Sequence, residues 1–202
     1  MRKIVSYHRI LVALAALGAV LLAWPTTGAA QTVTGNASVV RATVLGLLGS
    51  TTTELASTGS LTDSTDARQA SQTTGGITSL LTGETLHATT IGWPDEAASE
   101  ASVAALALNV AGSTIGADYV MGRALATSDA GGSGVSNIDN LSINGIPIDV
   151  TGEPNQTISI PGGEMVINEQ LTSAGGIVVN ALHVVVYGVA DVVVGSAAAA
   201  IQ

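Results

Sequence analysis

The chain has 202 residues, of which 47% are hydrophobic, only 10% are charged and none is cysteine. Residues 31–202 contain three arginines against fifteen acids, a net charge of −12, and the single lysine is Lys3. So little positive charge makes nucleic acid and anionic membrane surfaces poor partners. The absence of cysteine excludes disulfides, thiol nucleophiles and thiolate metal sites. The hydrophobic content argues against a disordered acidic chain.

The first thirty residues have the pattern of a secretory signal peptide. Three basic residues lie within Met1–Arg9, an uncharged run follows over Ile10–Trp24, and Gly28-Ala29-Ala30 supplies a small-x-small site. The apolar run is shorter than the ~20 residues that a transmembrane helix needs. We therefore expect cleavage near Ala30, before Gln31, and a secreted or cell-surface protein. Residues 31–202 are then a single domain without a transmembrane segment.

The mature chain is rich in Ala, Val, Gly, Ser and Thr, and β-branched residues alternate between clusters of turn residues. Alternation with a period of two predicts β-strands. The fold class expected is an all-β antiparallel β-sandwich, with a β-helix or solenoid as the alternative. The expected strands are 32–45, 52–61, 77–81, 85–91, 101–110, 114–127, 138–149, 156–160, 164–171, 176–187 and 190–200.

Several connections are predicted from their turn chemistry. Asn144-Gly145 and Pro161-Gly162-Gly163 contain residues that tolerate a positive φ, as tight turns require. Asp129–Gly134 is expected to be a flexible Gly/Ser loop and the internal boundary of the domain. For Pro94–Ala105 we favour a loop that continues into a strand over a short helix.

An internal echo favours a sandwich built from similar hairpins. Ala107–Val110 and Ala117–Ala124 resemble Ala181–Val184 and Ala190–Ala197, so each copy is expected to be a hairpin whose second strand opens with Ala-Asp. Two copies are too few for a solenoid, which usually needs three or more units. In this alignment Asn109 takes the place of His183.

The segment 176–187 is apolar at both odd and even positions, which predicts a strand covered on both faces. A transmembrane helix over 177–201 is disfavoured because Asp191 would lie near mid-membrane. We expect homo-oligomerisation through 176–200, by edge-to-edge strand addition or face-to-face packing, since this segment contains no lysine that would oppose pairing of an exposed strand edge with another chain. The alternative is that this hairpin lies inside a monomeric sandwich and is covered by its own chain.

The second half of the chain carries a series of short motifs in a specific order. They are Leu141–Ile148, Pro154–Gly162, Val166–Gln170, Val179–Val184 and Ala190–Ala197. Together they resemble the choice-of-anchor P family of exported bacterial surface proteins, densely over 135–200 and more loosely over 85–127. The resemblance implies a secreted β protein without an assigned reaction. Many members carry a C-terminal sorting or anchoring tail, whereas this chain stops at Ala200-Ile201-Gln202, so release or non-covalent assembly is expected.

His183 is the strongest catalytic candidate, because Asp191 or Glu169 could serve as its partner in acid–base chemistry. The internal echo opposes that role, since the amide of Asn109 cannot take up a proton at neutral pH. We therefore expect His183 to be structural and His183→Asn to leave folding nearly unchanged. His87 and His183 lack the short spacing of metal ligands, so they do not indicate a metal site. The Gly-x-Ser-x-Gly motif of many hydrolases is absent, and no catalytic residue is assigned.

Two weaker binding sites remain open. Asp129, Asn137 and Asp139 flank a glycine-rich stretch and are candidates for weak calcium binding, although the EF-hand arrangement is absent. Trp93, beside Asp95, is the candidate platform for a sugar, with a plug at the edge of the core as the alternative. No cofactor other than calcium is expected. A non-catalytic, exported structural or assembly protein is the favoured function, and a surface module binding carbohydrate, another cell-surface polymer or a cell is the alternative.

Overall fold

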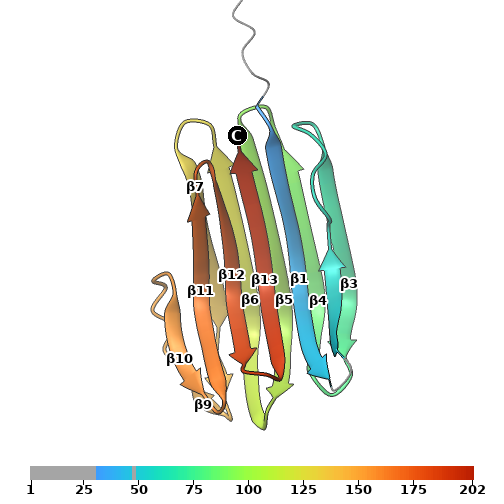
Figure 1. Cartoon of the computed structure of the whole chain (residues 1–202), viewed down its shortest axis with the longest axis vertical. Helices are drawn as coiled ribbons and strands as arrows, with labels where there is room; N and C mark the ends of the chain where they lie inside the picture. Colours follow the sequence, from blue (N-terminus) through green and yellow to red (C-terminus); the bar gives the residue numbers. More distant parts are fainter. Residues whose placement is uncertain (1–30, 47–48) are drawn as a thin grey trace, which may run out of the picture. The chain divides into compact units, whose positions relative to one another are not determined.

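The computed structural model describes residues 31–46 and 49–202, which belong to one compact unit and contain strands but no helix. Two antiparallel sheets pack face to face (Figure 1), which confirms the predicted all-β sandwich and not the β-helix. No helix among these residues is long and apolar enough to cross a membrane. The predicted signal peptide lies outside the described residues.

Sheet A has the strand order β10-β11-β12-β13-β1-β2, and sheet B has the order β3-β4-β5-β6-β8-β9, with β7 also paired to β6. The strands of sheet A are β1 (Val33–Gly46), β2 (Gly49–Ser57), β10 (Gln156–Ile160), β11 (Gly163–Ser173), β12 (Gly176–Val186) and β13 (Ala190–Ile201). Those of sheet B are β3 (Ala67–Ile77), β4 (Leu81–Gly92), β5 (Glu96–Val110), β6 (Ser113–Thr127), β7 (Gly131–Asp139), β8 (Ser142–Ile143) and β9 (Ile146–Pro147).

The prediction of a flexible boundary loop at Asp129–Gly134 is wrong. Only its first part is a turn, because residues 131–134 begin β7 and pair with β6. The glycines of this stretch serve close packing rather than flexibility: a Cβ at Gly132 would lie 2.6 Å from the carbonyl carbon of Gly176 in β12. A side chain at this position would force the two sheets apart.

Three further expectations need correction. The stretch 67–77, which was not expected to be a strand, forms the edge strand β3, whose mostly polar side chains face solvent on one sheet edge. The expected strand 77–81 is mainly the turn between β3 and β4. The expected strand 138–149 is broken after Asp139, and β8 and β9 flank the predicted Asn144-Gly145 turn. The segment before β5 is a turn running into a strand, as favoured.

The core changes in side-chain size from one end of the sandwich to the other. Next to the chain ends of the domain it is built largely from alanine, including Ala97, Ala124 and Ala197. The larger part of the core contains Leu, Ile, Val and Met side chains, such as Leu182 and Met165. Burying these side chains removes apolar surface from water at roughly 25 cal/mol per Å².

An irregular row crosses sheet A, formed by residues that face one another on five successive strands: Ala56, Val39, Gly195, Ala181 and Asn168. Ala56, Gly195 and Asn168, on alternate strands, have φ values of 47°, 67° and 52°. A left-handed residue interrupts the alternation of a strand, so the side chains beyond it change face. β1 has no left-handed residue of its own, but it is interrupted at the same row, where the consecutive residues Val39 and Val40 are both fully buried.

The same change of face explains the two-sided apolar pattern of β12. Ile177 and Val179 point into the core before the row, and Leu182, Val184 and Val186 do so after it. One buried stripe therefore occupies odd positions and then even ones. The prediction of a strand with two separately covered apolar faces is wrong.

The position of β12 and β13 also corrects the expected assembly mode. Each has a hydrogen-bonded neighbour on both sides, β11 and β13 for β12, and β12 and β1 for β13. Edge-to-edge addition through 176–200 has no free strand edge to use. The hairpin lies inside the sheet, with its inner face covered by its own chain, whereas face-to-face packing of two copies through 176–200 stays a prediction.

The connection from sheet A to sheet B is held by a carboxylate. One oxygen of Asp66 accepts hydrogen bonds from Arg68 Nε at 2.8 Å and from the backbone and hydroxyl of Thr62 at 2.9 Å. The hydrogen bond from Arg68, followed by those from Thr62, lowers the pKa of Asp66 from 3.8 to about 2. These bonds favour the ionised form, so they are lost when the carboxylate is protonated.

We expect Asp66→Asn to lose stability at neutral pH and to reduce the acid sensitivity of the domain. Because the folded-state pKa is depressed, the contribution of Asp66 is present above pH 4 and is lost as the pH falls toward about 2. Urea midpoints of wild type and variant should therefore differ at pH 6 and converge near pH 2. Asp95→Asn, in the turn before β5, is the control, and a constant gap between wild type and Asp66→Asn would contradict this role.

Candidate functional site

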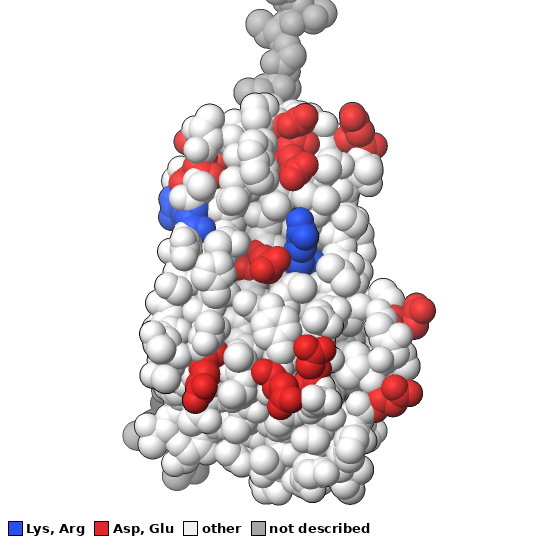
Figure 2. All heavy atoms as spheres, turned by 180° about the vertical axis from the view of Figure 1, so that it is seen from behind, with Lys and Arg blue, Asp and Glu red and all other residues white. Residues whose placement is uncertain are grey.

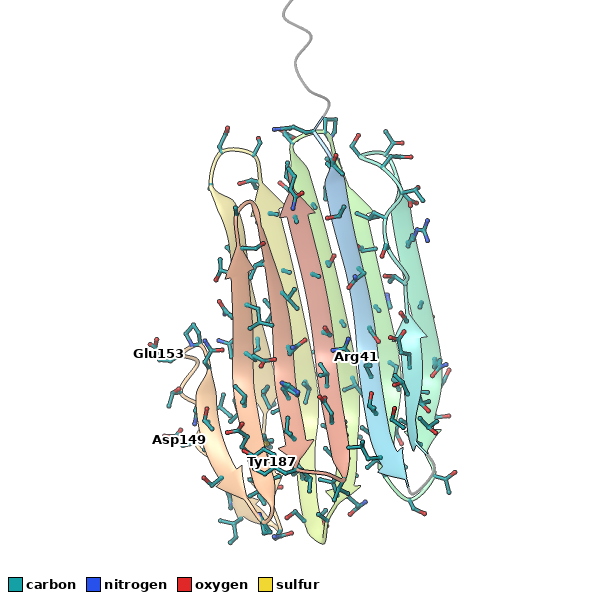
Figure 3. The ribbon with its side chains drawn as sticks, viewed as in Figure 1. Arg41, Asp149, Glu153 and Tyr187 are labelled. Atoms are coloured by element: carbon teal, nitrogen blue, oxygen red, sulfur yellow. The ribbon has the colours of Figure 1, made fainter. Side chains whose placement is uncertain are left out.

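β11, β12 and β13 lie side by side in sheet A (Figure 3), and hydrogen-bonded polar side chains connect them on the outer face of the sheet. Glu169 of β11 is paired with Asn180 of β12, and Asn180 is paired with Ser196 of β13. His183 belongs to β12, three residues after Asn180, and Asp191 belongs to β13, five residues before Ser196. We call these five residues the polar cluster.

His183 lies between two carboxylates. Its Nδ1 is 3.0 Å from both carboxylate oxygens of Glu169, and its Nε2 is 3.1 Å from Oδ1 of Asp191. The side chains of His183 and Glu169 are 20% and 17% exposed, and that of Asp191 is 53% exposed. A neutral imidazole carries a proton on one nitrogen only, so both contacts are hydrogen bonds in the imidazolium form alone.

The buried amide of Asn180 extends the cluster to the side. Its Nδ2 donates to Oε2 of Glu169 at 2.6 Å, and its Oδ1 accepts from the hydroxyl of Ser196 at 2.7 Å. Glu169 is thereby held by both Asn180 and His183. The result is a continuous chain of hydrogen bonds across three strands, next to the irregular row.

The neighbours of Glu169 on β11 hold the chain on the other side. Asn168, buried and left-handed, donates from Nδ2 to the carbonyl of Gly152 at 3.0 Å. Gln170 donates from Nε2 to Oδ1 of Asn168 at 3.0 Å and to the carbonyl of Gly134 at 3.1 Å. The motif Asn168-Glu169-Gln170 thus ties β11 to the connection before β10, to β7 and to the polar cluster.

The cluster contains the titratable groups of an acid–base site, but its one hydroxyl, that of Ser196, is bonded to Asn180 and not to His183. The partners of His183 in the described part of the chain are two carboxylates and no hydroxyl. No group of three or more His, Cys, Asp or Glu residues within 31–46 and 49–202 has a geometry suited to a metal ion. The polar groups of the cluster instead satisfy one another, as buried polar groups must.

The structure does not bring the calcium candidates together. Asp129 lies in the turn before β7 and Asp139 is the last residue of that strand, whereas Asn137 is close to Asp139 only. Eight residues of extended chain separate the two ends of β7 by about 26 Å. A single ion cannot bridge them, so the prediction of a shared site is wrong.

Trp93 is exposed in the turn between β4 and β5, where its backbone N–H donates to Glu96 at 2.7 Å. The nearest aromatic candidate on the same sheet, Tyr119, faces Ala104 of β5, eight residue pairs along the hairpin from Glu96. That spacing corresponds to about 26 Å. Trp93 therefore does not form a shared aromatic platform with Tyr119.

The equivalence of Asn109 and His183 does not hold in the structure. The two segments do form hairpins, and β13 opens with Ala190-Asp191, but β6 begins four residues before Ala117. Asn109 lies next to the β5–β6 turn and accepts a hydrogen bond from Thr114. His183 lies in mid-strand and pairs with Val193. The echo is one of sequence and not of register, so it does not bear on the role of His183.

Sequence reasoning paired His183 with Glu169 and Asp191 but missed Asn168, Asn180 and Ser196. Asn180 was the available signal, because it is the one amide in a strand that is apolar apart from Asn180 and His183. A polar residue in a buried strand needs a hydrogen-bond partner. The partner could not be named without the register of three strands.

The fold and the cluster define an all-β sandwich protein with an internally bonded polar cluster on one outer face. Comparison of the chain with protein-family models, curated proteins and solved structures found no match. The resemblance to the choice-of-anchor P family therefore stays a prediction.

Proposed function

We propose that this chain is an exported, non-catalytic structural protein of the cell exterior, related to the choice-of-anchor P proteins, in which the polar cluster braces the sheet. The observation that carries this proposal is the mutual saturation of the cluster. Both nitrogens of His183, both functional ends of the Asn180 amide and both oxygens of Glu169 are engaged by neighbouring side chains. A general base needs a free position from which to take a substrate proton.

The location of the cluster supports a bracing role. It lies beside the irregular row, where the alternation of sheet A is interrupted and the strands change face. Charge-assisted hydrogen bonds stabilise such a region by about 1.5–3 kcal/mol each. An exported protein without cysteine has no disulfide to serve this purpose.

His183→Asn is therefore expected to cost about 1–3 kcal/mol of unfolding free energy, because the shorter amide cannot contact both carboxylates. This replaces the expectation, drawn from the sequence echo, of a nearly neutral change. Urea denaturation of the secreted protein gives the measurement. His87→Asn is the matched control, since the side-chain hydrogen bond of His87 in the described part of the chain is to Gln69, at 3.2 Å, and involves no carboxylate.

A double-mutant cycle with Glu169→Gln tests whether the two residues act together. We expect a coupling energy of about 0.5 kcal/mol or more between positions 169 and 183. Variants of His183 that keep full stability would refute the brace and make a chemical role for this residue the better explanation. Recovery of the chain from the cytoplasmic fraction alone would refute the proposed location.

A further inference from the structure

The two ends of the sandwich differ in charge. Five turns at one end, between the strands β3–β4, β5–β6, β8–β9, β10–β11 and β12–β13, contain no charged residue: they are residues 78–80, 111–112, 144–145, 161–162 and 187–189. The turns at the opposite end contain Asp63, Asp66, Asp95 and Asp129. Figure 2 shows this asymmetry on the outer face of sheet B, whose lowest part carries neither red nor blue atoms. We call the uncharged end the neutral end.

Exposed apolar side chains lie together at the neutral end. Val44 and Leu45 come just before Gly46, the last residue of β1, and Tyr187 and Val189 belong to the turn between β12 and β13. Figure 3 labels Tyr187 in this turn. Tyr187 is 65% exposed and Leu45 is 50% exposed. The backbone N–H of Leu45 donates to the carbonyl of Val189 at 2.9 Å, so the two segments are neighbours. We call these four residues the apolar rim.

The size of the apolar rim argues against a second copy of the chain as its partner. A stable protein interface buries about 800 Å² on each side. Four partly exposed side chains on two adjacent segments offer on the order of a few hundred Å². They are exposed at the end of β1 and in the turn between β12 and β13, however, and exposed apolar side chains of this kind can enter a lipid interface. A tyrosine suits that position because its ring is apolar and its hydroxyl can stay hydrated.

The charge around the apolar rim restricts the kind of lipid. The charged residues nearest to the rim along the strands are Asp191, second in β13, and Glu164, second in β11. Both are acidic, and the mature chain has a net charge of −12. Anionic headgroups would therefore repel this end, whereas a surface without net charge would not.

We propose that the apolar rim docks onto an electrically neutral lipid surface, with Leu45, Tyr187 and Val189 entering the interface. This docking is a property of the neutral end and does not depend on the bracing role of the polar cluster. Burial of these side chains supplies the attraction, and the uncharged turns allow the close approach.

Flotation of residues 31–202 with phosphatidylcholine vesicles tests the proposal. We expect the wild type to float with these vesicles and to bind phosphatidylglycerol vesicles less. Tyr187→Asp should lower the vesicle-bound fraction on the order of tenfold, since it removes an apolar group and adds a charge at the interface. Leu171→Asp is the matched control, because Leu171 is 56% exposed but lies near the opposite end of β11, and it should bind as the wild type does.

Circular dichroism of both variants verifies that they are folded, which the exposure of both positions leads us to expect. Absence of wild-type flotation, an equal loss in the two variants, or stronger binding to phosphatidylglycerol would each overturn the proposal. A dimer in solution that Tyr187→Asp dissociates, together with no vesicle binding, would identify a second copy as the occupant instead.

Discussion

Val186→Lys is expected to unfold the domain, whereas Val185→Lys should leave it folded. Val186 is 3% exposed and belongs to the main core, so an ammonium group there would be buried without a partner. The expected loss of about 4–5 kcal/mol or more is comparable with the whole stability of a typical domain. Circular dichroism and urea denaturation of the two variants provide the measurement.

Val185 is the matched control because it is adjacent, of the same type and on the outer face of β12. It pairs with Glu164 on β11 and with Asp191 on β13, two acids that a lysine side chain can approach. The change in unfolding free energy should stay within about 1 kcal/mol. A folded, monomeric Val186→Lys variant would show that position 186 is an intermolecular contact, as the assembly prediction for 176–200 required.

Gly122→Ala is expected to destabilise the protein by about 3 kcal/mol or more. A Cβ at Gly122 of β6 would overlap the backbone carbonyl oxygen of Gly195 in β13, which belongs to the opposite sheet. Both contacting groups are backbone, so relief requires a shift of a whole strand rather than a rotamer change. Thermal or urea unfolding of the variant measures the loss.

Gly116→Ala, on the same strand, is the control for Gly122→Ala. A Cβ at Gly116 would lie 3.4 Å from the hydroxyl of Ser142 and 3.7 Å from the carbonyl oxygen of Leu106, which are ordinary contacts. Its effect should therefore stay within about 0.5 kcal/mol. Equal stability losses at positions 116 and 122 would show that the general effect of replacing glycine by alanine in a strand, and not the close approach of the two sheets, decides the outcome.

Several features of the candidate site could be predicted from the sequence in part. The expected partners of His183, Glu169 and Asp191, are the ones that the structure shows. The equivalence of Asn109 and His183 that the internal echo predicted is wrong, because the two hairpins differ in register. Asp129 and Asp139 are close in the sequence, but they lie at opposite ends of the extended strand β7 and are therefore far apart in space.

The sequence by itself determined the fold class. Alternating β-branched residues and turn chemistry at Asn144-Gly145 and Pro161-Gly162 are local properties, and local properties specify strands and tight turns. It also determined the poverty in positive charge and the absence of cysteine, which need no structure at all.

Only the tertiary structure decided which side of each strand is buried. The strands change face at the irregular row, including β1 and β12, which contain no left-handed residue themselves. Ala56 and Asn168 gave no local signal of this, because their conformation depends on the neighbouring strands. The strand identity of residues 131–134 was likewise hidden, since glycine there serves close packing against β12. Both are consequences of contacts between residues far apart in the chain, and a pattern read along the chain contains no information on which strands become neighbours.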